Sequence, residues 1–176
     1  MTAIQQLRRS ALAAAIALPA LAGAAEATPE YATFEPVEAA PSAGSARALD
    51  GETVTLGPTA DRPVLVHFFA TWCAPCKEEL PELARFAAAR RETVRVVGVD
   101  VAEPASRVAA FVAPLGLGFP VALDEDRAIA RAFGVRALPS TVLIAPGGRS
   151  ALRAAGPVDW SAAAIENLIE NHRIRN

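Results

Sequence analysis

The sequence predicts an α/β sandwich in which a mixed central sheet carries helices on both faces. The chain has 176 residues, of which 52% are hydrophobic and 20% charged, so it is long and apolar enough for one globular domain with a sizeable core. Short apolar runs of strand length alternate with longer segments whose apolar residues recur at helical spacing. A hairpin signal precedes this alternation. Together these patterns indicate a layered sheet-and-helix domain with an N-terminal β-hairpin extension.

The first half of the domain begins with that hairpin. Asp50-Gly51 is a turn signal, and Arg47–Leu49 and Thr53–Leu56 have the length of its two strands. The next run, Val64–Ala70, is apolar on both faces, as a central strand of a largely parallel sheet should be. It leads into Ala74–Arg90, where the apolar spacing predicts an amphipathic helix.

The second half continues the alternation of strands and helices. A buried strand is predicted at Thr93–Val99, followed by a helix over Ala105–Leu115 that two glycines end. The remaining elements are, in order, a strand at Val121–Leu123, a helix at Asp126–Phe133, a strand at Thr141–Ala145, a turn at 146–148, a returning strand at Ser150–Ala154 and a last helix from Trp160 to about His172. This order of elements completes the sandwich.

The segment before the domain resembles an export signal. Arg8 and Arg9 form a basic region, and an apolar stretch from Ala11 to Leu21 leads to small residues suited to cleavage. We therefore expect residues 1–25 to be a signal peptide or an uncleaved anchor, which gives a periplasmic or other extracytoplasmic protein. Residues 26–46 are rich in proline and alanine and are predicted to be a flexible linker, so the domain spans 47–176.

Charge and cysteine content exclude several function classes. The net charge is −2 and no basic patch is evident, so no nucleic-acid partner is expected. Cys73 and Cys76 are the only cysteines, too few for a disulfide scaffold. A bridge across two residues closes almost no loop and stabilises little. A structural zinc site needs four ligands, and only His67 and His172 could add nitrogen, so no metal or other cofactor is expected.

A redox role for the two cysteines remains. Trp72-Cys73-Ala74-Pro75-Cys76 joins a predicted buried strand to a predicted helix, an arrangement typical of thiol–disulfide exchange sites. Cysteine attacks as the thiolate, which a helix N-terminus favours, so Cys73 is the expected nucleophile. Cys76 lies one turn further in and is the expected resolving thiol. Pro75 suits the first turn of a helix, where its missing N–H costs nothing.

The residues around the cysteines resemble a known family. Residues 69–81, Phe-Ala-Thr-Trp-Cys-Ala-Pro-Cys-Lys-Glu-Glu-Leu-Pro, are similar to the W-C-x-P-C-x-x-E-x-P signature of the TlpA-type thioredoxin-like proteins. These are exported or membrane-tethered thiol–disulfide oxidoreductases, and some serve cytochrome c biogenesis. The resemblance extends over about residues 47–172 and implies a thioredoxin-like three-layer sandwich.

The resemblance also implies roles for further residues. Glu79 matches the family's glutamate, three residues after Cys76, where a carboxylate can exchange protons with the buried thiol. Pro139 matches a cis-proline that would lie against Cys73, with the Leu138 backbone offered to an extended substrate. Trp72 would shield the site and contact partners. The alternatives are an exposed helix carboxylate, a trans proline in a loop and an ordinary core tryptophan.

His67 departs from the family pattern. The matching strand position commonly holds aspartate in thioredoxins and asparagine in many TlpA-type proteins. A histidine there could relay a proton to Cys76 or, if charged, favour a thiolate. A neutral, hydrogen-bonded core histidine is the equally weighted alternative.

The sequence therefore predicts an exported thiol–disulfide oxidoreductase, with a reductase of protein disulfides as the leading hypothesis. The resemblance implies a membrane electron donor of the DsbD/CcdA kind and substrates such as apocytochrome c or copper-site proteins, and a monomer is expected. A thiol oxidase or isomerase would use the same residues with a different direction of electron flow. A copper metallochaperone of thioredoxin fold is the alternative from another class, although such carriers typically use Cys-x-x-x-Cys and a distal histidine.

Overall fold

A computed structural model describes residues 31–37, 41, 44–161 and 163–174 of the chain. The predicted signal segment, residues 1–25, lies outside these ranges. Within them, no helix is both long enough and apolar enough to span a bilayer.

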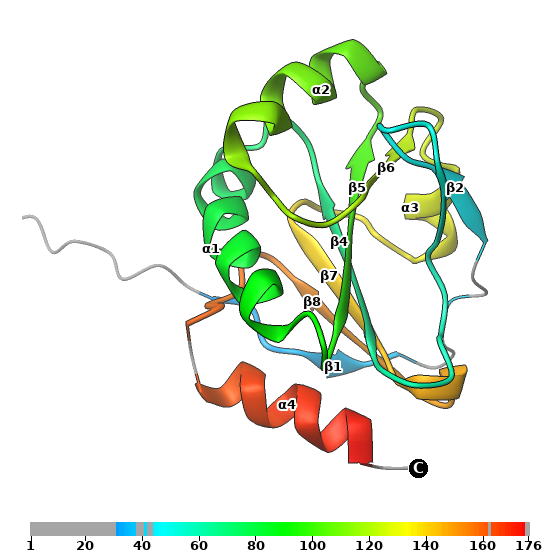
Figure 1. The fold of residues 1–176 in the computed structure, drawn as a ribbon, viewed down its shortest axis with the longest axis vertical. Coiled ribbons are helices and arrows are strands. Elements are labelled where there is room, and N and C mark those ends of the chain that lie inside the picture. Colours follow the sequence, from blue (N-terminus) through cyan, green and yellow to red (C-terminus); the bar gives the residue numbers. More distant parts are fainter. Residues whose placement is uncertain (1–30, 38–40, 42–43, 162, 175–176) are drawn as a thin grey trace, which may run out of the picture.

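The centre of the domain is a six-stranded mixed sheet with the order β1-β8-β7-β4-β5-β6 (Figure 1). Strand β4 lies inside the sheet, and β5 and β6 run parallel to it. Strand β7 is antiparallel to β4, and β8 is antiparallel to β7, so β8 again runs in the direction of β4. All six residues of β4 are buried, as the apolar run predicts. The bounds are β1 Glu35–Pro36, β4 Val64–Phe69, β5 Arg95–Val101, β6 Val121–Asp124, β7 Ser140–Ile144 and β8 Ala151–Ala155.

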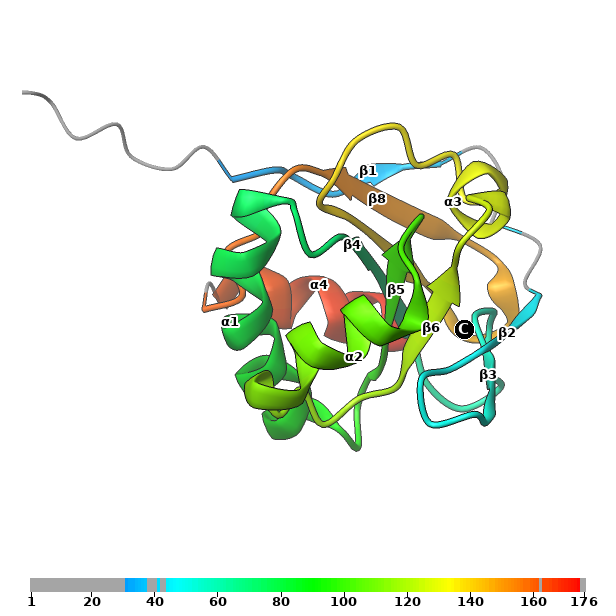
Figure 2. The ribbon, with the colours of Figure 1, turned by 90° about the horizontal axis from the view of Figure 1, so that it is seen from above.

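Helices cover one face of this sheet, and a helix and a hairpin cover the other (Figure 2). The first layer holds α1 (Ala74–Arg90), α2 (Ala105–Val112) and α4 (Ala163–Ile174), and the second holds α3 (Ala128–Ala132) and the hairpin of β2 (Ser45–Arg47) and β3 (Thr53–Thr55). Alternate β4 side chains enter the two cores: Leu65 and Phe69 pack with α1 and α4, and Phe68 packs with α3 and the hairpin. The predicted three-layer arrangement with a mixed sheet is confirmed.

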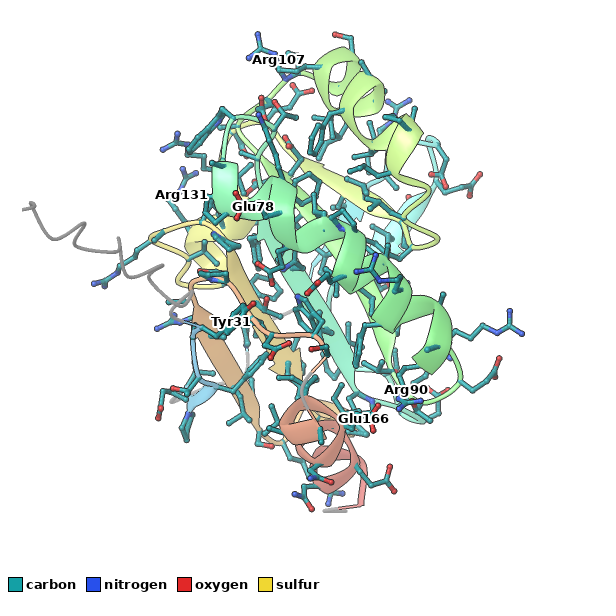
Figure 3. The ribbon with its side chains drawn as sticks, turned by 90° about the vertical axis from the view of Figure 1, so that its left-hand side faces the viewer. Tyr31, Glu78, Arg90, Arg107, Arg131 and Glu166 are labelled. Carbon is teal, nitrogen blue, oxygen red and sulfur yellow. A yellow bond between two sulfur atoms is a disulfide. The ribbon has the colours of Figure 1, made fainter. Side chains whose placement is uncertain are left out.

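Helix α1 positions the cysteine pair. Cys73 is its N-cap residue, and Pro75 stands in its first turn, as predicted. Leu80 and Leu83 are fully buried against the sheet and fix the rotation of the helix about its axis. At its far end, Arg90 pairs with Glu166 of α4 (Figure 3). The cysteines consequently lie just beyond the C-terminal end of the inner strand β4.

Parts of the chain differ from the sequence prediction. The first hairpin strand lies at Ser45–Arg47 and not at Arg47–Leu49. The linker predicted for residues 26–46 is corrected in part, because Glu35–Pro36 forms β1 and pairs antiparallel with β8. A two-residue edge strand has no periodicity of its own and exists only because β8 offers a free edge. The last helix begins at Ala163 and not at Trp160, whose buried ring instead packs against Phe86 and bonds to α1.

Candidate active site

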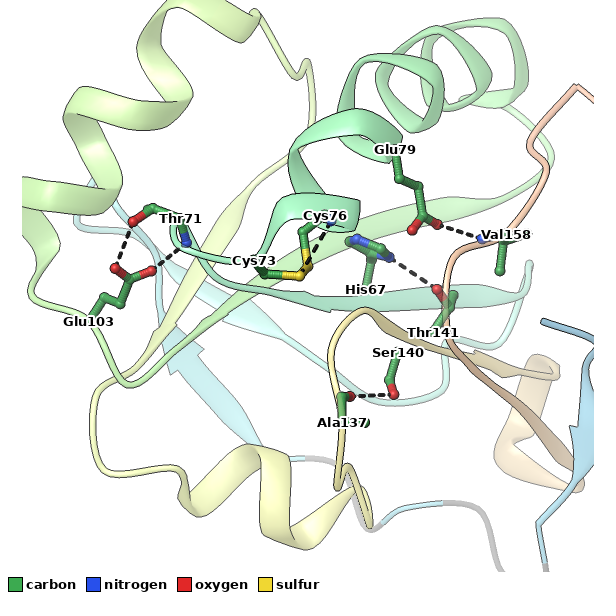
Figure 4. Close-up of a disulfide and its surroundings, with 10 residues drawn as sticks. All are labelled: His67, Thr71, Cys73, Cys76, Glu79, Glu103, Ala137, Ser140, Thr141 and Val158. Atoms are coloured by element: carbon green, nitrogen blue, oxygen red, sulfur yellow. Dashed lines mark hydrogen bonds between the residues drawn. A yellow bond between two sulfur atoms is a disulfide. The ribbon is translucent and has the colours of Figure 1, made fainter. Parts of the chain in front are cut away.

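A disulfide between Cys73 and Cys76 lies at the N-terminus of α1 (Figure 4). The S–S distance is 2.09 Å, and the Cys76 N–H donates to Cys73 Sγ at 3.3 Å. Cys73 is 5% exposed and Cys76 is 0% exposed, so only Cys73 can be reached from solvent. The unpaired N–H groups and dipole of the helix end favour negative charge on the Cys73 sulfur after reduction. The order of roles predicted from the sequence therefore agrees with the geometry.

The segment before β7 carries the predicted cis-proline. The Leu138–Pro139 peptide bond is cis, as predicted, and Pro139 is buried. The Pro139 carbonyl accepts from the Gly156 N–H at 2.9 Å, and Ser140 Oγ donates to the Ala137 carbonyl at 2.8 Å. Among the described residues, the backbone of Leu138 makes no hydrogen bond. An extended chain from outside can therefore pair with it.

Glu79 is a buried carboxyl group and not an exposed helix residue. Its Oε1 accepts from the ring N–H of Trp160 at 2.6 Å and from the Val158 N–H at 3.2 Å. Its Oε2 is buried with no hydrogen-bond partner among the described residues. Burial raises the pKa of Glu79 to about 7, although both hydrogen bonds act to lower it. The carboxyl group can therefore hold or release a proton near neutral pH.

His67 lies between Cys76 and Glu79 in the close-up (Figure 4). Its Nδ1 is 3.0 Å from Thr141 Oγ1, and its Nε2 is buried with no partner among the described residues. Burial lowers the pKa of His67 to about 3, so the ring is neutral at physiological pH. Burial therefore disfavours a charged His67 while the cysteines form a disulfide, and the roles of relay and of packed core residue both fit this geometry.

A second acidic group, not found by sequence reasoning, holds the turn before Trp72. The Glu103 carboxylate accepts from both the N–H and the hydroxyl of Thr71. These bonds lower the pKa of Glu103 in spite of its burial. Asp100 lies fully buried nearby, and burial and the Glu103 charge raise its pKa to about 8. The feature of the sequence that could have revealed this acidic pair is the position of Asp100 directly after a predicted buried strand.

Trp72 is 61% exposed, so it is not a core residue. It lines a groove of about 360 Å³ that Leu138 also lines. The aromatic side chain and the cis-proline segment thus border the same surface next to Cys73. This position is compatible with the partner contact predicted for Trp72.

The chain is similar in sequence to a known protein family and to characterised oxidoreductases. The family described as AhpC/TSA matches residues 37–149. Thiol-disulfide oxidoreductase ResA from Bacillus subtilis is 37% identical over 101 residues, which cover 57% of this chain and 56% of the relative. The protein of the same name from Halalkalibacterium halodurans is 33% identical over 97 residues, covering 54% of this chain and 55% of the relative. The matched region thus spans little more than half the length of these curated relatives.

Solved structures extend the likeness to most of the domain. StoA from Bacillus subtilis has a TM-score of 0.62 at 26% identity, over 75% of this chain and 97% of that chain. A thiol:disulfide interchange protein of the thioredoxin family from Chlorobium tepidum has a TM-score of 0.67 at 23% identity, over 81% of this chain and 99% of that chain. The thioredoxin-like fold is confirmed.

The raised pKa of Glu79 predicts a pH-dependent stability of the oxidised protein. In the unfolded chain this carboxyl group ionises near its ordinary pKa of 4.5, but in the folded protein it ionises near 7. The folded state therefore binds more protons between these values, and the Glu79 contribution to the free energy of unfolding falls by at most about 3 kcal/mol as the pH rises through them. Glu79→Gln removes this fall.

Urea unfolding of both oxidised proteins at pH 5 and pH 8 measures the effect. The stability of the wild type relative to Glu79→Gln should decrease between the two pH values, whatever the constant cost of the substitution. An equal difference at both pH values would show that Glu79 is ionised at its ordinary pKa.

Proposed function

The chain belongs to the AhpC/TSA family, and from this premise we propose that it is an exported thiol–disulfide oxidoreductase that reduces disulfides of other proteins. Its likeness to ResA and StoA supports a place among the TlpA-type thioredoxin-like proteins. One observation carries the proposal: the two cysteines share the N-terminus of α1, and only Cys73 reaches the surface.

The reaction is a two-step exchange. The Cys73 thiolate attacks one sulfur of a partner's disulfide, forming a mixed disulfide and expelling the other partner sulfur as a thiolate. Cys76 then attacks Cys73 Sγ, which releases the second partner thiol and forms the Cys73–Cys76 disulfide seen in the structure. Two electrons pass to the partner, and an external dithiol restores the starting state by the reverse exchange.

The second step requires Cys76 to lose its proton in a buried place. Glu79 Oε2 and His67 Nε2, two buried polar atoms that have no hydrogen-bond partner within the described part of the chain, lie on the side of α1 that carries Cys76. Unpaired buried polar atoms are costly to stability, which supports a function for them. We assign Glu79 as the proton acceptor, because a base with a pKa near the working pH transfers protons most effectively. Neutral His67 is assigned as the relay between the thiol and that carboxylate.

The substrate surface is the segment that carries the cis-proline. The free Leu138 backbone can add an extended partner segment as a short β-pairing, and this places the partner's sulfur over Cys73. Trp72 covers the other side of that segment with its exposed ring. These contacts recognise a backbone, and they suit protein substrates of varied sequence.

The proposal extends to the cellular location of the protein, its electron donor and its substrates. The basic and apolar residues of segment 1–25 support an extracytoplasmic location, with the segment either cleaved or retained as an anchor. In that location a membrane protein of the DsbD/CcdA kind would supply the dithiol. Apocytochrome c and copper-site proteins are the proposed substrate class, and the protein is proposed to act as a monomer.

Trapping tests the reaction order. Cys76→Ser should stall the exchange at a mixed disulfide on Cys73, because the resolving thiol is missing. Mass spectrometry of the adducts formed in the native compartment identifies the partners, and Cys73→Ser is the matched control that should trap none. If Cys76→Ser forms no adduct while the wild type binds copper tightly through both thiols, the protein is a metal carrier and the proposal is wrong.

The relay role of His67 has a separate test. His67→Leu keeps a side chain of similar size but removes the ring nitrogens. We expect the thiolate absorbance of the reduced variant, plotted against pH, to be shifted relative to that of the wild type. Thr141→Val is the comparison variant: it keeps the ring of His67 and removes the hydroxyl that bonds to it. Superimposable curves for His67→Leu and the wild type would leave His67 as a packing residue.

A further inference from the structure

The groove next to the disulfide carries a cluster of positive charge. Arg127, Arg131 and Arg136 line it together with Trp72 and Leu138. We call it the arginine groove. Trp72 precedes Cys73 in sequence and Leu138 precedes the cis-proline, so the groove continues the surface on which a partner's disulfide would lie.

The charge in the groove is not paired within the part of the chain that the structure describes. All three arginines are exposed, as Arg131 illustrates (Figure 3), and the described residues that line the groove include no acidic side chain. None of the three takes part in an ion pair among the described residues. The chain as a whole has a net charge of −2, so this cluster is a local departure from the overall balance.

The nearby carboxylates are engaged with backbone groups. Asp124 accepts from the N–H groups of Ile129 and Ala130 at 2.9 and 2.7 Å. Asp126 accepts from the Ala128 N–H at 3.0 Å, and its carbonyl, not its carboxylate, receives Arg131. These hydrogen bonds hold both carboxylates at the start of α3, and among the described residues neither forms an ion pair with an arginine of the groove.

The spacing of the arginines makes this arrangement unfavourable in the free protein. Arg127 is the N-cap of α3 and Arg131 lies within it, and because both line the groove their like charges repel. Arg136 adds a third charge to the same groove. An arriving carboxylate relieves this repulsion and can accept two parallel hydrogen bonds from one guanidinium group. The groove is therefore complementary to acidic residues.

We propose that the arginine groove binds acidic residues that flank the disulfide of a partner protein, and so selects partners by charge. This inference rests on the proposed function, because the groove borders the sulfur that the partner must reach. The occupant is an extended protein segment that pairs with the Leu138 backbone and places aspartate or glutamate side chains on the arginines. The apolar part of the groove and Trp72 receive the residues between the acids and the cysteine.

Test peptides that share one disulfide measure this selection. The first version carries aspartate and glutamate beside the disulfide, the second asparagine and glutamine, and the third lysine. The protein is first reduced with dithiothreitol, the dithiothreitol is removed, and the rate at which the protein reduces each peptide is measured. The acidic peptide should react roughly three- to tenfold faster than the lysine peptide at low salt. The gap should shrink in 1 M salt, where the Debye length falls to about 3 Å.

Charge reversal provides the matched comparison. Arg131→Glu combined with Arg136→Glu should invert the order of the three rates. Arg149→Glu changes one charge in the same direction on an exposed residue beyond the other end of β7, and it should keep the order. The combination of Arg131→Gln and Arg136→Gln, which should abolish the preference, covers the case in which the reversed variant fails to fold.

The outcomes separate this inference from the proposed function. Equal rates for the three peptides with the wild type, or an unchanged order in the reversed variant, would overturn the groove assignment and leave the reductase proposal standing. If no peptide is reduced, the reductase proposal fails. In that case, fluorescence anisotropy of labelled peptides without cysteines still decides the groove: preferential binding of the acidic peptide supports it, and equal binding overturns it.

Discussion

The position of Cys73 as the N-cap of α1, directly after a fully buried strand, is the constraint on which the rest of the site depends. Strand β4 is held on both sides by β5 and β7, so its end is a fixed point. Leu80 and Leu83 fix the rotation of α1 on the sheet, which turns Cys76 inward and leaves Cys73 at the surface. Cys73 thereby keeps 5% of its surface open to partners at a helix end that favours negative charge, whereas Cys76 is fully buried.

The same burial that protects Cys76 determines the protonation of its neighbours. Burial favours the neutral form of each group, so it raises the pKa of Glu79 and lowers that of His67. Both side chains keep one polar atom without a partner, which a core selected for stability alone would avoid. The cost is understandable if these atoms serve the buried thiol during exchange. On the outer side, the Glu103 carboxylate accepts two hydrogen bonds from Thr71 and so fixes the turn before Trp72.

The sequence was sufficient for the features that depend on local pattern. The residues of α1 were predicted to the exact bounds, because an apolar stripe and a proline in the first turn are local signals. The cis bond before Pro139 came from the family resemblance and is confirmed. Features that arise from distant pairings were missed: β1 exists through its pairing with β8, and Trp160 leaves the last helix to bond with Glu79, 81 positions earlier in the chain. The charge state of His67 also needed the structure, since burial and not residue type decides it.

The central claim is that the fold exposes one reactive thiol and buries the other. Alkylation of the reduced protein with iodoacetamide at neutral pH, followed over time by mass spectrometry, tests this claim most directly. The account predicts that Cys73 is modified while Cys76 stays protected, and that both react once the chain is unfolded in guanidinium chloride. Equal modification of both cysteines in the folded protein, or faster modification of Cys76, would contradict it.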